Sequence, residues 1–228
     1  MRYAILAAEP FLDTRHYSRA EVFWYVGGFL AWVPAYTAIL VIAVKQKRLE
    51  IPVLAATGNV TWEFVWGFLF HVDMGWGLQW IYRGAFIMDL PILIFVYVYG
   101  AKQTNVPLVR RWFVLINTGI VAGWVAFHVT MKNSGYDLPL GSVSAYAVNV
   151  VESAAYLWFG LTLANPRDLS MTVAWSKFIG TGMVTVFIFM VFYGNPFVRC
   201  LAVIVTVLDI SYTVVLHNRI RQARLAAA

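Results

Sequence analysis

The chain has 228 residues, of which 61% are hydrophobic and 12% are charged, and its formal net charge is +6. A soluble domain carries roughly twice that share of charged residues, so the composition excludes an ordinary water-soluble fold and predicts a polytopic membrane protein. The basic residues lie in short clusters between apolar runs, a pattern that encodes membrane topology and argues against nucleic acid as a partner.

Seven apolar runs are long enough to cross a bilayer, which takes about 20 mostly apolar residues in a helix. They are Val22–Val44, Ile51–Phe70, Ala85–Ala101, Trp112–Met131, Val143–Ala164, Thr172–Tyr193 and Phe197–His217. The breaks between them are short, except for His71–Gly84, whose aromatic residues favour a segment at the bilayer interface. We therefore expect one all-α domain over residues 1–228, with seven transmembrane helices.

Lysine and arginine indicate the orientation of such a protein because they are enriched in cytoplasmic loops. With Lys177 and Arg199 counted in the loops before the spans that they begin, 11 of the 17 belong to the loops after the first, third and fifth spans and to the C-terminal tail, and six to the N-terminal segment and the other loops. This predicts that the N-terminus lies outside and the C-terminus in the cytoplasm, as an odd number of spans requires. The host membrane would be the plasma membrane in a bacterium and the endoplasmic reticulum in a fungus.

Four of the 11 acidic residues fall inside predicted spans: Glu63, Asp89, Glu152 and Asp209. An acid in the bilayer costs about 2.5–3.5 kcal/mol on insertion scales, which makes each of them a functional candidate. We expect no lysine or arginine deep in any span, so the four acids lack an evident salt-bridge partner. Burial then favours the neutral form of a carboxyl group, and a protonated acid in apolar surroundings is suited to general acid catalysis.

Polar and aromatic side chains accompany these acids on their helices. Residues three or four positions apart share a helix face, and such faces are expected to point into the bundle because lipid cannot satisfy polar groups. Trp62, which adjoins Glu63, and Trp124 of the fourth span are added to these residues. The side chains expected to line the interior with the acids are Asn59, Trp62, Trp66, Trp124, Asn149, Tyr156 and Tyr212.

A structural interpretation stands beside the functional one. The acids would then join helices by hydrogen bonds, and Asp89, near a predicted helix start, would cap that helix and contact water. His71 and His128 lie near the ends of predicted spans and are expected at the membrane interface.

Three other classes of small helical membrane protein fit the chain less well. A retinal protein needs a Schiff-base lysine deep in a late helix, and the seventh predicted span has none. A bis-histidine haem protein would have to pair His71 with His128, which are expected too near the surface. A small sugar-type transporter with seven spans normally carries matching prolines in two repeats; Pro34 and Pro91 have no counterparts, but this class remains the alternative.

Two motifs point to a family. The strings "NVTWEFVWGF", which contains Glu63, and "VLDISY", which contains Asp209, resemble the small integral-membrane terpene cyclases of meroterpenoid and indole-terpenoid pathways, found in fungi and bacteria. The resemblance implies a seven-helix protein with an outer N-terminus. It also implies that Glu63 and Asp209 are the essential catalytic acids.

The chemistry expected of such an enzyme is protonation without a metal or another cofactor. Neither DDxxD nor DxDD occurs in the chain, and no acidic cluster has metal-ligand spacing. A protonated acid would open a terminal epoxide or protonate an alkene of a farnesyl- or geranylgeranyl-bearing substrate within the bilayer, and ring closure would follow. The expected substrate-binding residues are Trp62, Trp66, Asn59, Trp124, Asn149, Glu152, Tyr156 and Tyr212, whose aromatic members would stabilise the carbocation.

Overall fold

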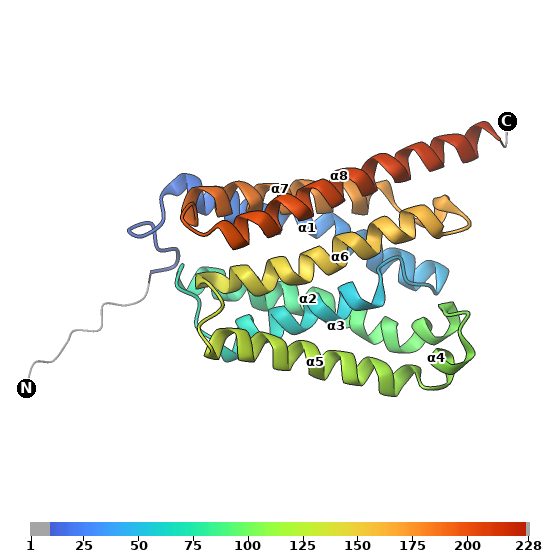
Figure 1. The fold of residues 1–228 in the computed structure, drawn as a ribbon, viewed down its shortest axis with the longest axis horizontal. Helices are drawn as coiled ribbons and strands as arrows, with labels where there is room; N and C mark the ends of the chain where they lie inside the picture. The colour runs from blue at the N-terminus through green and yellow to red at the C-terminus, as the bar shows by residue number, and fades with distance from the viewer. Residues whose placement is uncertain (1–9, 227–228) are drawn as a thin grey trace, which may run out of the picture.

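The computed structural model describes residues 10–226, and within this range the chain is helical, without a strand. The long helices run side by side along the longest axis of the molecule (Figure 1). In chain order the elements are α1 (Arg19–Gln46), α2 (Val53–Phe64), the π-helical turn η1 (Val65–Leu69), α3 (Trp76–Gln103), α4 (Pro107–Arg111), α5 (Phe113–Asn133), the 3-10 turn η2 (Pro139–Gly141), α6 (Ser142–Thr162), the 3-10 turn η3 (Pro166–Asp168), α7 (Met171–Val191) and α8 (Pro196–Leu225). The predicted all-α fold is confirmed.

Five helices of the described range, α1, α3, α5, α7 and α8, are long and apolar enough to cross a membrane. Helix α2 has only 12 residues before it widens into the π-helical turn η1, and α6 carries polar side chains along its length, among them Asn149 and Glu152. The five-residue α4 brings the described α-helices to eight. The count of seven spans and the orientation of the termini therefore stay predictions.

Helix α3 begins at Trp76, well before the predicted span that starts at Ala85. Residues 76–84 are thus the first turns of a long helix and not a break between two spans. Their location at the bilayer interface stays a prediction. The aromatic side chains of this stretch lie in two different environments. Trp76 and Trp80 are exposed, as at an interface, whereas Tyr82 is fully buried in the core.

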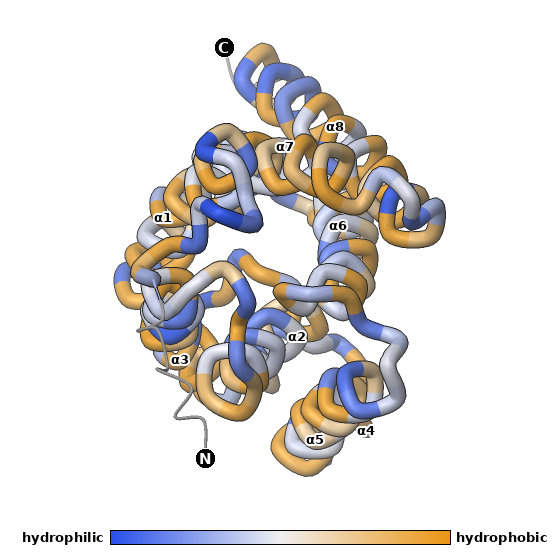
Figure 2. Tube along the Cα trace, turned by 90° about the vertical axis from the view of Figure 1, so that its left-hand side faces the viewer, coloured by the Kyte–Doolittle hydropathy of each residue, from blue (hydrophilic) through white to orange (hydrophobic). Residues whose placement is uncertain are grey.

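Six helices close into a ring. Helix α1 packs on α7, α7 on α8, α8 on α6, α6 on α2, α2 on α3, and α3 returns to α1, while α5 packs outside the ring against α2 and α3. Viewed along the bundle, the traces of α1, α2, α6 and α7 face one another across the middle of this ring (Figure 2). The arrangement brings residues from both halves of the chain to one interior site.

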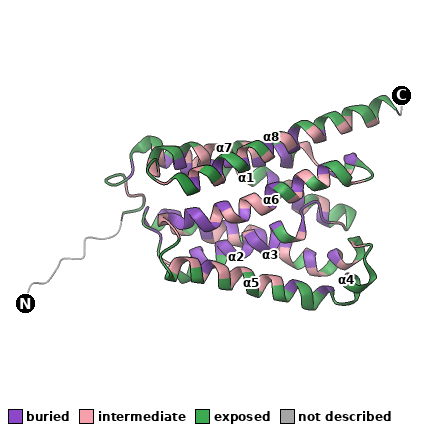
Figure 3. Ribbon diagram, viewed as in Figure 1, coloured by how far each residue is buried: buried purple, intermediate pink, exposed green. Residues whose placement is uncertain are grey.

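The outward faces of the ring are apolar, in agreement with a lipid environment. Large hydrophobic side chains such as Leu30, Ile87, Val114 and Val207 are exposed, and exposed residues follow the outer sides of the helices (Figure 3). Contiguous exposed apolar surface of this extent is foreign to monomeric soluble proteins. The buried residues, including most of the polar ones discussed below, lie inside the bundle.

Candidate active site

A pocket occupies the centre of the ring. It encloses about 650 Å³ of space free of protein atoms, part of which is open to the outside. Its walls come from four helices, and the residues that line it are Tyr25, Phe29, Trp32, Tyr36, Asn59, Trp62, Glu63, Ala145, Tyr146, Val148, Asn149, Thr181 and Val184. Six of these side chains are aromatic, so the pocket suits a large hydrophobic ligand.

One wall of the pocket is an aromatic stripe on α1. Tyr25, Phe29, Trp32 and Tyr36 follow one another at spacings of four, three and four residues, so they lie on one face of the helix. At 1.5 Å per residue the stripe extends about 16 Å along the helix axis. None of the four was predicted as a site residue, although their spacing is a signal that the sequence does contain.

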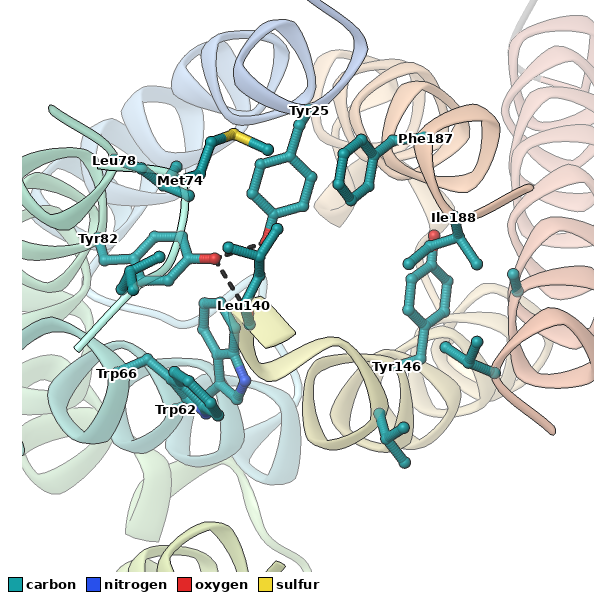
Figure 4. Packing of buried hydrophobic residues seen from close by; sticks show 14 of the residues in the cluster. Tyr25, Trp62, Trp66, Met74, Leu78, Tyr82, Leu140, Tyr146, Phe187 and Ile188 are labelled. Carbon is teal, nitrogen blue, oxygen red and sulfur yellow. Dashed lines mark hydrogen bonds between the residues drawn. The ribbon is translucent and has the colours of Figure 1, made fainter. Parts of the chain in front are cut away.

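At the end next to the η2 turn, the pocket is bounded by hydrogen-bonded aromatic side chains. The hydroxyl groups of Tyr25 and Tyr82 lie 2.5 Å apart, and Tyr82 donates to the carbonyl oxygen of Leu140 at 3.0 Å. Trp62 donates from Nε1 to the carbonyl oxygen of Gly141 at 3.2 Å and to Oγ of Ser144 at 3.1 Å. These bonds join α1, α2, α3, the η2 turn and α6, and those of Trp62 hold its ring in the wall. The bonds between Tyr25, Tyr82 and Leu140 are drawn in Figure 4.

Glu63 is the acid of the pocket: no other acidic side chain belongs to its described lining. The side chain is buried, and Oε1 accepts a hydrogen bond from the hydroxyl group of Tyr36 at 3.1 Å. Within residues 10–226, no N–H or O–H donor reaches Oε2. A proton on Oε2, with Tyr36 on the carbonyl oxygen, is the hydrogen-bonding pattern of a neutral carboxylic acid.

Asp89 stands directly behind Glu63. It lies in the middle of α3 with 1% of its surface exposed, so the prediction that it caps a helix and contacts water is wrong. That prediction depended on the late start assigned to the third span. The carboxyl groups of Asp89 and Glu63 are close enough to hydrogen-bond each other, and neither oxygen of Asp89 has another donor in the described chain.

Asp209 has a buried cation as its partner, which contradicts the expectation that no lysine lies deep in the bundle. Lys177 of α7 places Nζ 2.6 Å from Oδ1 of Asp209 and 2.6 Å from Oγ of Ser153. The Lys177 ammonium group also lies 5.6 Å from the ring centre of Trp32, which lines the pocket. The topology count placed Lys177 with the loop before the sixth predicted span, but it is fully buried one and a half turns inside α7.

Glu152 lies one hydrogen bond away from the pocket. Its Oε2 accepts from Nδ2 of Asn59 at 3.1 Å, while Oε1 has no donor among the described residues. Because Asn59 lines the pocket, it connects the ligand space to a buried polar layer that contains Glu152, the Lys177–Asp209 pair and Asp89.

The predicted site residues divide into two groups by position. Asn59, Trp62, Glu63 and Asn149 line the pocket. The remaining predicted site residues lie outside its lining: Trp66, Trp124, Glu152, Tyr156, Asp209 and Tyr212.

The aromatic members of the second group are packed elsewhere in the bundle. Trp66 is buried near Gly141, and Tyr156 packs on Tyr212 with ring centres 5.2 Å apart. Trp124 stacks on His128 on the outer helix α5. His128 itself is fully buried, and its predicted depth near the membrane interface stays a prediction.

The acids do not form a metal centre in the described structure. No group of three or more histidine, cysteine, aspartate or glutamate side chains between residues 10 and 226 is arranged to hold an ion. The metal-free reaction therefore stays a prediction that rests on the sequence motifs.

Comparison with known proteins supplies the family. The model of the Pyr4-like transmembrane terpene cyclases matches residues 15–222, nearly the whole chain. The chain is also similar to the terpene cyclase dpasB of Apiospora sacchari, with 22% identity over 153 residues, which cover 67% of this chain and 63% of that relative. No solved structure matches. A helical membrane architecture, an aromatic pocket with a buried acid and the family match agree, and the chain belongs to the Pyr4-like transmembrane terpene cyclases.

Proposed function

We propose that the protein cyclises a prenylated, lipophilic substrate inside the membrane, and that Glu63 starts the reaction by protonating the terminal epoxide or alkene. One observation carries this proposal: Glu63 is the acid in the described lining of an otherwise largely aromatic pocket. A metal-free, acid-initiated reaction is what such a pocket can supply from its own side chains.

Charge balance favours a neutral Glu63. The buried polar layer contains four acids and one cation, Lys177. An unpaired buried charge costs several kcal/mol, so one ammonium group supports one carboxylate, and Asp209 at 2.6 Å is that carboxylate. Glu63, Asp89 and Glu152 then keep their protons, and of these three only Glu63 lines the pocket.

Proton transfer from Oε2 of Glu63 would convert the substrate to a cation without any other reactant. With an epoxide, the oxygen gains the proton and the bond to its more substituted carbon breaks; with an alkene, the proton forms a new carbon–hydrogen bond. Neighbouring double bonds then attack the cationic carbon and close rings, and loss of a proton ends the cascade, so the product is an isomer of the substrate.

The protein stabilises both partners of this transfer. Aromatic faces such as those of Trp32, Tyr36 and Trp62 stabilise a nearby cation by about 0.5–2 kcal/mol each. The Tyr36 hydroxyl group hydrogen-bonds to Glu63, and this bond strengthens when Glu63 becomes a carboxylate. Asp209 is a positioning residue in this scheme, because it holds Lys177 beneath Trp32.

The decisive experiment uses membranes that contain the full-length protein. A farnesylated aromatic compound is supplied either as the terminal alkene or as the terminal epoxide, in D₂O, and the products are analysed by mass spectrometry. Alkene protonation gives a cyclised isomer with one non-exchangeable deuterium on carbon. Epoxide opening gives an isomer from the epoxide alone, whose hydroxyl deuterium exchanges away.

The matched control is Glu63→Gln, which keeps the size and the Tyr36 hydrogen bond but has no acidic proton. We expect it to abolish cyclisation of both substrates. Full turnover by this variant would refute Glu63 as the donor. Movement of an unaltered solute across vesicles, with no cyclised product, would instead favour the transporter alternative.

A further inference from the structure

The pocket lining has one polar non-aromatic side chain on α6 and one on α7, at a level between two hydrogen bonds that join these helices, Tyr146–Thr185 and Lys177–Ser153. Thr181 of α7 lines the pocket with 4% of its surface exposed, and its hydroxyl oxygen has no hydrogen-bond partner in the described chain. A hydroxyl group buried without a partner costs about 1–3 kcal/mol. An unpaired hydroxyl at the edge of a pocket indicates that a ligand supplies the missing partner.

The hydroxyl group of Thr181 is not bonded within its own helix, unlike those of six other helical threonines in this protein. A threonine in a helix normally donates to the carbonyl oxygen four residues earlier. Six do so here at 2.7–2.9 Å: Thr37, Thr57, Thr61, Thr162, Thr206 and Thr213. Among residues 10–226 the hydroxyl of Thr181 is thus free, whereas the hydroxyls of these six threonines are occupied within their own helices.

Asn149 of α6 offers a second unpaired group to the same pocket. Its Nδ2 donates to the carbonyl oxygen of Ala145 at 3.1 Å, and this carbonyl can only accept, so Oδ1 is left for the pocket side. Oδ1 is buried and has no donor among the described residues. Around these two groups the wall is apolar, with Ala145, Val148 and Val184.

We propose that Thr181 and Asn149 form a subsite for a hydroxyl group on the ring to which the prenyl chain is attached. Oδ1 of Asn149 can only accept a hydrogen bond, whereas the Thr181 hydroxyl can also donate one. A phenolic or enolic hydroxyl meets both requirements, since it donates to Asn149 and accepts from Thr181. The inference rests on the proposed function and names its substrate class as hydroxylated prenyl arenes or enols.

This subsite also orients the substrate. Glu63 and Trp62 belong to α2, whereas Thr181 and Asn149 belong to α7 and α6. A ring anchored at the α6–α7 wall leaves the prenyl chain to extend along the aromatic stripe of α1 toward Glu63. The subsite therefore decides which end of the substrate reaches the acid. A substrate without the hydroxyl group would no longer be held in this orientation.

The test measures binding, not turnover, so that it is independent of the cyclase assay. Purified full-length Glu63→Gln protein in detergent is titrated with farnesylphenol and with farnesylbenzene, and the quenching of tryptophan fluorescence gives each dissociation constant. We expect farnesylphenol to bind roughly tenfold more tightly, the value of about one well-formed hydrogen bond. Thr181→Val and Asn149→Leu, each added to this background, should remove the preference by weakening phenol binding alone.

Thr206→Val is the matched control, because it also removes one helical hydroxyl but outside the pocket lining. It should keep the preference for the phenol and lower the melting temperature, since it breaks a hydrogen bond. Thr181→Val should leave the melting temperature unchanged or raise it, because it removes an unpaired buried group. A threonine with a merely structural role would show the opposite pattern.

Equal binding of the two probes, binding of neither probe, or a preference that survives both pocket variants would overturn the subsite. The result is separable from the proposed function. If Glu63→Gln retained full cyclase activity while Thr181→Val lost the phenol preference, the subsite would stand and the role of Glu63 would fall.

Discussion

The ammonium group of Lys177 lies 2.6 Å from Oδ1 of Asp209, with both side chains almost completely buried. This ion pair joins α7 to α8, and the Ser153 hydroxyl extends it to α6. Removal of one partner of a buried ion pair leaves the other charge uncompensated and costs about 3–5 kcal/mol. A loss of activity on mutation of Asp209 is therefore no evidence by itself that Asp209 donates a proton.

The pair can be separated from the chemistry with a double variant. We expect Asp209→Asn and Lys177→Met each to lower the free energy of unfolding by about 3–5 kcal/mol, and Asp209→Leu combined with Lys177→Met to restore most of it, because both charges are then gone. Since Glu63 is intact, the double variant should also regain part of the cyclase rate that each single variant loses. Thermal unfolding in detergent and product formation measure the two quantities. If the double variant folds stably but turns over no faster than the background, Asp209 takes part in a chemical step, which would contradict its role as a positioning residue.

Much of the fold is readable from the sequence because lipid imposes long apolar runs on it. Most predicted spans match helices with ends a few residues apart, although α8 continues past its predicted end to Leu225. The start of α3 was missed because aromatic content alone does not distinguish exposed tryptophans from a tyrosine that is buried in the core. The burial of Tyr82 depends on its tertiary partners, Tyr25 and Leu140, which the local sequence does not indicate.

The site was only partly readable. Glu63 and Trp62 stand out because an acid between tryptophans is out of place in an apolar helix. The stripe on α1 is regular, but many aromatic residues elsewhere in the chain hide it. Lys177 and Thr181 could not be assigned, because their roles depend on which helices pack against α7. Asp209 supplies a partner for the lysine, and among residues 10–226 no group supplies one for the threonine hydroxyl.

The hydrogen bond from Tyr36 to Glu63 should act on rate more than on stability. Tyr36→Phe removes the donor to Oε1, which stabilises the carboxylate formed after proton transfer, so we expect the maximal rate to fall about tenfold with little change in the melting temperature. Tyr97→Phe is the control, because it also loses one hydroxyl hydrogen bond, to Thr118, far from the pocket lining. Equal rates for the two variants would show that Tyr36 does not support the acid.

Glu50, in the loop between α1 and α2, should make stability depend on pH. It is buried, and desolvation raises its pKa to about 7, against the opposing hydrogen bond from the backbone N–H of Ser170 and the charge of Arg48. The folded state therefore keeps a proton that the unfolded chain releases near its ordinary value of 4.5. The stabilisation is complete below that value and is lost as the pH rises through about 7, and the total loss is about 3 kcal/mol.

Melting temperatures of the wild type and of Glu50→Gln, measured between pH 5 and pH 8, check this prediction. The wild type should lose stability over this range relative to the variant, whose amide does not titrate. Subtraction of the two profiles removes the contribution of other titrating groups, such as Asp13 and Asp137. Parallel profiles would mean that Glu50 does not titrate differently in the folded protein.

The π-helical turn that follows Glu63 is held by a side chain of α3. Gln79 donates from Nε2 to the carbonyl oxygens of Trp66 and Gly67, both at 2.7 Å, and of Phe70 at 3.2 Å. Such turns leave carbonyl groups outside the regular helical pattern and are frequent at functional sites. Gln79→Leu should lower the free energy of unfolding by about 1–3 kcal/mol, because the carbonyl groups of Trp66 and Phe70 lose this donor, whereas that of Gly67 keeps Arg83.

Gln79→Leu should also slow cyclisation, because η1 is continuous with the end of α2 that places Glu63 and Trp62 in the pocket wall. Gln103→Leu is the matched control on the same helix: Gln103 hydrogen-bonds both backbone groups of Leu49 at the other end of the bundle. We expect the two variants to lose similar stability, and only Gln79→Leu to lower the rate measured at a temperature where both are folded. A rate for Gln79→Leu equal to that of Gln103→Leu would show that the π-helical turn supports the fold without positioning the acid.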